Sequence, residues 1–118
     1  MTAALVLTFA SLGQLTIGEV KLEADRFQFT EGPVWLPSGE LAFSDIPADT
    51  IFKLDKSALH KPSGNSNGLT LDSEGRLIRC EHGNRRVARV ERNDEVTVLA
   101  DSYQGKKLNS PNDAVMRS

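Results

Sequence analysis

The sequence repeats one polar corner at a fixed interval, and this repeat restricts the possible folds more than any other feature. Residues 31–41 and 67–77 align at a constant offset of 36 positions, with glycines and a leucine in step. Later in each unit, residues 50–54 and 86–90 keep the same offset as short β-type runs. A third copy begins at Asn112, 45 positions after Asn67. Units of about 35–50 residues, each made of four short strands, are typical of propeller blades.

Most of the chain consists of short β-type runs separated by turn signals, with no long segment of helical period. Turn signals rich in glycine, proline, asparagine and aspartate precede most of these runs. The strands we expect lie at residues 17–22, 40–44, 50–54, 68–71, 76–80, 86–90 and 95–99, and a further one starts at Ala114. The sequence therefore predicts an all-β fold, and the repeat favours a propeller of which about two and a half blades are present.

The repeated corner is also the candidate functional feature. Glu31 precedes Gly32 and Pro33, residues suited to a close backbone approach and to the first position of a strand. If the units are blades, Glu31, Asn67 and Asn112 occupy equivalent positions where inner strands begin beside a central channel. Carboxylate and amide oxygens are the ligands that a hard divalent cation such as calcium takes. The alternative is structural, because asparagine before glycine commonly forms a turn and most exposed carboxylates only solvate a surface.

Composition indicates a soluble globular protein, with 39% hydrophobic and 25% charged residues. The net charge of −2 gives no electrostatic reason to expect nucleic acid as a partner. Cys80 is the only cysteine, which excludes an internal disulfide and a zinc cluster of thiolates. We expect it to be a small strand residue.

The N-terminal residues 1–20 form a leader or a signal segment, and residues 21–118 form the blades. Residues 3–12 are mostly apolar, as in the core of a secretory signal, but no basic residue precedes them and no clear cleavage site follows. The run is shorter than the roughly 20 apolar residues that span a bilayer. An extra strand is the alternative, and the sequence leaves a secreted, periplasmic or cytoplasmic location open.

Five motifs in order give the chain a family resemblance. They are Phe-Thr-Glu-Gly-Pro-Val-Trp at residues 29–35, Phe-Ser-Asp-Ile-Pro at 43–47, Asn-Gly-Leu-Thr-Leu-Asp at 67–72, Cys-Glu-His-Gly-Asn-Arg-Arg-Val at 80–87 and Leu-Asn-Ser-Pro-Asn-Asp at 108–113. From about Lys21 to its last residue, the chain resembles the gluconolactonase branch of the regucalcin-like family. This resemblance implies a six-bladed propeller that binds a divalent cation in its channel and hydrolyses sugar lactones.

The resemblance also implies roles for individual residues. Glu31 matches a metal ligand, and Asn112 matches an amide at the metal and substrate site. Asn67 and His82 are candidates for contact with the substrate. The implied cation is calcium, with zinc or magnesium as alternatives, and a cation can polarise a lactone carbonyl and activate a bound water.

Other polar residues of these motifs have less defined roles. Arg85, like His82, lies in a polar loop and either borders the substrate or supports the loop; we favour support for both. Asp45 and Asp113 either support the site or form turns. The general base has to come from elsewhere.

The length departs from the family, since six blades need well over twice 118 residues. We therefore expect an N-terminal fragment that lacks the remaining ligands and the base, with little or no lactonase activity and weak metal affinity at most. Uncovered strand edges would favour self-association. The alternatives are a non-catalytic metal- or ligand-binding propeller, a pseudoenzyme fragment, or a related esterase or phosphotriesterase, because the fold does not fix the function.

Overall fold

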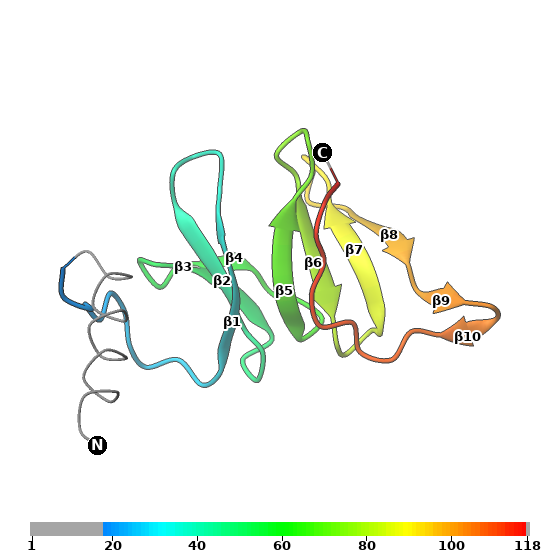
Figure 1. Cartoon of the computed structure of the whole chain (residues 1–118), viewed down its shortest axis with the longest axis horizontal. Helices are drawn as coiled ribbons and strands as arrows, with labels where there is room; N and C mark the ends of the chain where they lie inside the picture. The colour runs from blue at the N-terminus through cyan, green and yellow to red at the C-terminus, as the bar shows by residue number, and fades with distance from the viewer. Residues whose placement is uncertain (1–17, 118) are drawn as a thin grey trace, which may run out of the picture.

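The computed structural model describes residues 18–117, which form two four-stranded antiparallel sheets and a small hairpin (Figure 1). The first sheet consists, in spatial order, of β1 (Thr30–Trp35), β2 (Leu41–Asp45), β3 (Thr50–Lys53) and β4 (Ala58–His60). The second consists of β5 (Ser66–Leu71), β6 (Leu77–Glu81), β7 (Arg86–Val90) and β8 (Val96–Ala100). The hairpin pairs β9 (Ser102–Tyr103) with β10 (Lys106–Lys107).

The two sheets repeat each other in register. Strands β1, β2 and β3 begin 36 residues before β5, β6 and β7, as the sequence offset predicts. The pairing of β1 with β2 shifts register between Glu31 and Val34, and that of β5 with β6 shifts between Ser66 and Leu69. Each sheet thus has the up-and-down strand order of a propeller blade. The all-β prediction is confirmed, and we refer to the sheets as the first and second blades.

A shared hydrophobic core joins the two blades face to face. Its buried residues are Ala42 and Ile51 from the first blade and Leu69, Leu77 and Val90 from the second. Partly buried side chains from both blades pack against it, namely Val34, Leu36, Leu59 and Leu71. Burial of each large aliphatic side chain contributes about 1.5–3 kcal/mol. The core therefore holds the inner strands β1 and β5 beside each other.

The structure differs from the sequence expectations at four places. The sequence does not predict strand β4 or the hairpin β9–β10, because runs of two or three residues are too short to show alternation. Residues 18–22 form no strand, so the prediction of a strand at 17–22 is wrong for the part that is described. Residues 114–117 are also outside any strand, since none of the described strands pairs with them. The predicted leader falls mostly on residues 1–17, which lie outside the described range.

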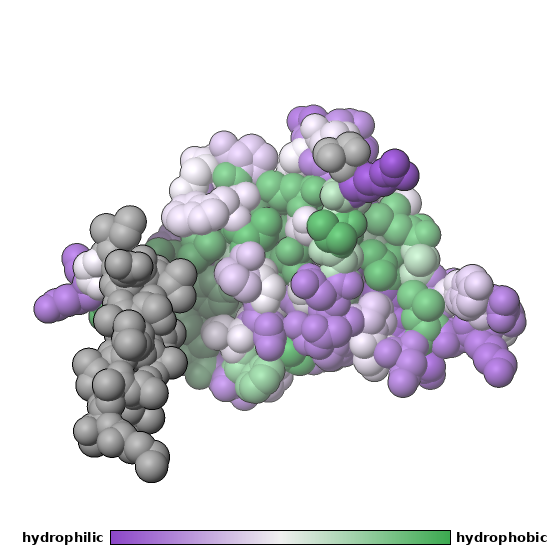
Figure 2. Space-filling model, viewed as in Figure 1, coloured by the Kyte–Doolittle hydropathy of each residue, from purple (hydrophilic) through white to green (hydrophobic). Residues whose placement is uncertain are grey.

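The C-terminal segment runs along the second blade, on a face rich in apolar residues. Figure 2 shows these residues gathered over the second blade around that segment. Large hydrophobic side chains that stay exposed include Val98, Leu99, Val115 and Met116. Cys80 is fully buried, and burial raises the pKa of its thiol to about 11. It is a strand residue, as the sequence predicts, and it is packed. None of residues 18–117 belongs to a helix long and apolar enough to cross a membrane.

Candidate functional site

The three repeated corners lie next to one another at one end of the blades. Gly32 faces the backbone of the second corner so closely that an added Cβ would overlap the carbonyl oxygen of Asn67. One step further, the backbone N–H of Gly68 donates to the carbonyl oxygen of Asn112 at 2.8 Å. The structure therefore brings the backbones of Glu31, Asn67 and Asn112 into one row, in chain order.

Glu31 lies on the inner strand β1, where it pairs with Ser44 of β2. Its side chain is half-buried and lines an open hollow of about 360 Å³. The other lining residues come from the approach to β1, from β1 itself, from β2 and from the β3 end, among them Lys21, Glu23, Phe27, Pro33, Phe43 and Leu54. A carboxylate in this position is accessible to a small ligand or to an ion.

Asp45 supports the segment that leads to Glu31. Its carboxylate is buried and accepts hydrogen bonds from the backbone N–H groups of Gln28 and Phe29, at 2.9 and 3.0 Å. These bonds fix the two residues before β1. Asp45 therefore belongs to the supporting structure and does not face the hollow at Glu31.

Asn67 is buried, and polar contacts fix both its backbone and its side chain. Its backbone oxygen accepts a hydrogen bond of 2.8 Å from the Ser44 hydroxyl, which also lies 2.9 Å from the hydroxyl of Ser66. Its side-chain Nδ2 lies 3.3 Å from Nε2 of His82. An amide N–H can donate to this ring nitrogen when the nitrogen carries no proton. The structure thus brings together two of the residues assigned to the substrate.

His82 also supports the corner through its backbone. Its N–H donates to the carbonyl oxygen of Asn65 at 3.2 Å, just as the N–H of Ile46 donates to Phe29 in the first blade at 3.1 Å. The two bonds are related by the 36-residue repeat. Loop support, the role we favour for His82 from the sequence, is therefore present beside its contact with Asn67.

Asn112 and Asp113 lie on the exposed segment that runs past the second corner. An added Cβ on Gly68 would overlap Oδ1 of Asp113 and approach the Asn112 carbonyl oxygen to 2.7 Å. Asp113 Oδ1 also accepts a hydrogen bond of 2.8 Å from the N–H of Ala114. Glycine at position 68 is what lets this segment lie so close to β5.

The donor types at the corners fit a hard cation but supply only part of a coordination shell. Glu31, Asn67 and Asn112 offer a carboxylate and two amide oxygens, whereas calcium takes six to eight oxygen ligands. Within residues 18–117 no group of three or more His, Cys, Asp or Glu side chains could hold a metal ion. Oxygen donors without nitrogen or sulfur favour calcium or magnesium over zinc.

Sequence reasoning missed a buried ionic cluster around Glu81. The Glu81 carboxylate is inaccessible to solvent. It accepts hydrogen bonds from Nε of Arg79 at 2.8 Å and from Nε of Arg86 at 2.6 Å. Asn84 adds a third donor at 2.5 Å. Burial alone would raise the pKa of Glu81, but the hydrogen bonds from Arg86 and Asn84 and the charge of Arg79 outweigh it and hold the pKa below its ordinary value. In the sequence, charged residues at the alternate positions 79 and 81 of one strand are the pattern that could have indicated this cluster.

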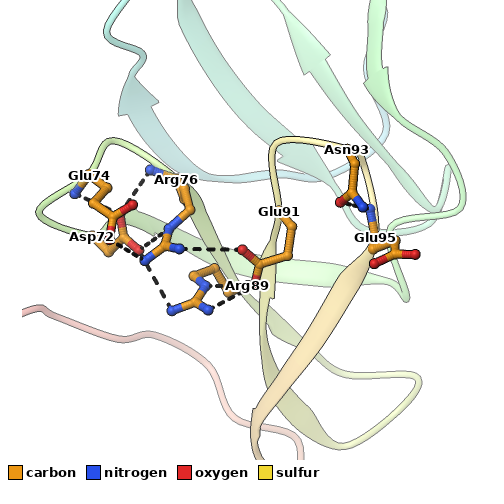
Figure 3. Close-up of polar contacts among 7 residues, drawn as sticks. All are labelled: Asp72, Glu74, Arg76, Arg89, Glu91, Asn93 and Glu95. Atoms are coloured by element: carbon orange, nitrogen blue, oxygen red, sulfur yellow. Dashed lines mark hydrogen bonds and ion pairs between the residues drawn. The ribbon is translucent and has the colours of Figure 1, made fainter.

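A second ionic cluster lies at the opposite end of the second blade (Figure 3). Arg76 donates to Asp72 at 2.7 Å and contacts Glu74 at 3.0 Å and Glu91 at 3.4 Å, while Arg89 contacts Glu91 at 2.8 Å. Asp72 Oδ1 also accepts the backbone N–H groups of Glu74 and Arg76. The carboxylates are thus neutralised by arginines, and the cluster ties the β5–β6 turn to β7.

Replacing Gly32 by Ala is expected to destabilise the protein more than replacing Gly39 by Ala. Both glycines have positive φ, 56° and 83°, so both substitutions introduce the same type of backbone strain. Only at Gly32 would the new Cβ overlap backbone atoms of the next blade; nothing lies within 4 Å at Gly39. We expect an extra loss of about 1–3 kcal/mol from this overlap, measured by urea unfolding. Equal losses for the two variants would contradict the close approach of the corners.

Comparisons with known proteins give consistent results. A family model described as "SMP-30/Gluconolactonase/LRE-like region" matches residues 29–118. A gluconolactonase from Zymomonas mobilis is 34% identical over 116 residues, covering 80% of this chain and 32% of that protein. The solved structure of a protein named a putative gluconolactonase is 42% identical, with a TM-score of 0.72 over 79% of this chain and 34% of its own. A gluconolactonase structure from Xanthomonas campestris is 31% identical, with a TM-score of 0.71 over 77% and 32%. The chain spans about a third of the length of these relatives.

Proposed function

The chain belongs to the SMP-30/gluconolactonase/LRE-like family, and on this premise we propose that it forms part of a longer, metal-dependent hydrolase of sugar lactones. The observation that supports this best is the row of corners, in which Gly32 contacts Asn67 and Gly68 binds the carbonyl of Asn112. The three corners of the row carry, in chain order, one carboxylate and two amide residues at one end of two blades. The relatives that are named gluconolactonases indicate the substrate class.

In this proposal Glu31 and Asn112 hold a divalent cation, with calcium as the first candidate. A bound cation supplies Lewis acidity, which polarises a lactone carbonyl and lowers the pKa of a water. The chain's own residues would bind and orient the lactone: the amide of Asn67, held by His82, presents a fixed polar group at the second corner, next to the corner that carries Glu31. Water adds to the carbonyl carbon, the ring C–O bond breaks, and the ring oxygen takes a proton to give the hydroxy acid. The base that removes the proton from water lies outside this set of residues.

The test compares the 118-residue chain with the longest natural form that contains it. Each is assayed for hydrolysis of gluconolactone as apoprotein, with added calcium, magnesium or zinc, and with a chelator. We expect the longer form to lose its activity with chelator and to regain it with cation, and the 118-residue chain to show little or none, because its described donors fill only part of a calcium shell. Unchanged activity in chelator would contradict the metal role.

A substrate panel separates the proposal from its alternatives. Preference for an organophosphate or a simple ester over the lactone would favour an esterase or phosphotriesterase of the same fold. Cation binding without hydrolysis of any substrate would favour a binding propeller.

A further inference from the structure

The path of the chain to Asn112 depends on few contacts. After β8 the chain turns out into the exposed hairpin β9–β10 and returns across the lower edge of the second blade to the corner (Figure 1). On the return, Leu108 N–H donates to the carbonyl oxygen of Asp101 at 2.8 Å, which closes the base of the hairpin. Leu108 is half-buried, whereas Asn112 and Asp113 are exposed. The orientation of Asn112 therefore depends on what anchors residues 107–112 to the blade.

Arg85 provides such an anchor from the β6–β7 turn. Its Nε donates to the carbonyl oxygen of Leu108 at 2.6 Å, and its Nη2 lies 3.4 Å from the carbonyl oxygen of Lys107. A guanidinium presents several donors in a fixed planar fork, and its charge strengthens each hydrogen bond. These bonds join residues that are 22 and 23 positions apart in the sequence.

The first blade has a comparable side-chain anchor at the equivalent turn position. Asp49 precedes Arg85 by 36 residues, and both have positive φ, 50° and 53°, in the turn between the second and third strands. Asp49 Oδ1 accepts the backbone N–H groups of Ser63 at 3.1 Å and Asn65 at 2.6 Å. These residues immediately precede the corner at Asn67. In both blades, then, the side chain of one turn residue ties down the segment that delivers the next corner.

From this recurrence we infer that Arg85 is a positioning residue, which fixes residues 107–108 and thereby the placement of Asn112 beside β5. The inference concerns the same site as the proposed function and, for its effect on activity, rests on that function. Arg85 itself lies on the exposed turn and touches neither Glu31 nor Asn67 in the hydrogen bonds of the described residues. Its action on the site passes through the backbone of residues 107–112.

The first test measures the backbone directly, with no need for activity. In the protein with Arg85→Asn, hydrogen exchange at the Gly68 amide, which donates to Asn112, should become at least about tenfold faster than in wild type. Asparagine tolerates positive φ, so this change removes the guanidinium without adding strain to the turn. The matched control is Arg92→Asn, which removes the same charge from the turn at the other end of β7 and should leave the Gly68 exchange rate unchanged.

Two results would overturn the inference. One is unchanged exchange at Gly68 in the Arg85→Asn protein. The other is an acceleration shared equally by the amides of β6, which would mean that the whole blade is destabilised and that Asn112 is not specifically released.

The second test uses the form that hydrolyses lactone. We expect Arg85→Asn to raise KM, or the cation concentration that gives half-maximal activity, about 10-fold, and to add nothing further in a protein that already carries Asn112→Ala. Independent, multiplicative effects of the two substitutions would contradict action through Asn112. If no form hydrolyses a lactone, the proposed function fails, while exchange at Gly68 still decides the positioning role.

Discussion

Replacing Glu31 by Gln should lower the kcat/KM for lactone hydrolysis about 100-fold or more in the form that carries the activity. Glu31 is the only carboxylate at the first position of the three corners, and the amide keeps its size while removing its charge. A cation supplies several kcal/mol of stabilisation to the transition state, and each 1.36 kcal/mol corresponds to about tenfold in rate. Steady-state kinetics at increasing calcium concentration measure the effect, and excess cation should restore part of the activity.

The matched control is Glu23→Gln. Glu23 lines the same hollow as Glu31 but belongs to the segment that precedes β1 and to none of the three corners. Its replacement should change kcat/KM less than about twofold, since it removes an exposed charge alone. Full activity of the Glu31→Gln protein at low calcium would exclude Glu31 as a ligand. Equal losses for both variants would instead assign the effect to the net charge of the hollow.

The 36-residue offset was sufficient to predict which segments become equivalent strands and which corners lie together. It works because a blade buries its faces against its neighbours, so that the pattern of turns and apolar residues has to recur from blade to blade. The offset placed Gly32 and Gly68 in step, and the structure shows that each is required by the close approach of the next corner. At these two positions the glycine in the sequence therefore reflects a close contact with the next corner.

The supporting contacts could not be predicted in the same way. The bond from Arg85 to Leu108 joins residues 23 positions apart through an irregular hairpin, and nothing in the sequence near Leu108 marks its carbonyl as an acceptor. The contact between Asn67 and His82 likewise depends on how the first residues after β6 lie beside the start of β5. A repeat predicts which backbone positions are equivalent, whereas individual side chains differ between copies: the position of Asp45 in the first blade is occupied by Glu81 in the second.

Replacing Glu81 by Ala should destabilise the protein by about 3–5 kcal/mol, the loss expected when one partner of a buried ion pair is removed. The carboxylate has no solvent exposure, and its removal leaves the buried Arg79 and the partly buried Arg86 without their acceptor. The Glu81 carboxylate also lies against Gly64, just before β5, so its removal deletes a packing contact of this glycine. Urea unfolding followed by circular dichroism measures the loss.

The control for this prediction is Glu95→Ala in the same blade. Glu95 is exposed in the β7–β8 turn, and its replacement should change the free energy of unfolding by no more than about 0.5 kcal/mol. A loss at Glu81 no larger than that at Glu95 would mean that the cluster around Glu81 does not stabilise the second blade.

The stabilising effect of Glu81 should also depend on pH, with a sign that follows from its pKa. The folded-state pKa is held below the ordinary value of about 4.5, so folding favours the ionised carboxylate. Its contribution is therefore fully present above about pH 4.5 and is lost as the pH falls through the folded-state pKa. The difference in unfolding free energy between wild type and Glu81→Gln should consequently be constant near pH 7 and shrink in acid. A difference that instead grows as the pH falls from 7 towards 4.5 would require a folded-state pKa above the ordinary value, and hence a carboxylate dominated by burial and not by its arginine partners.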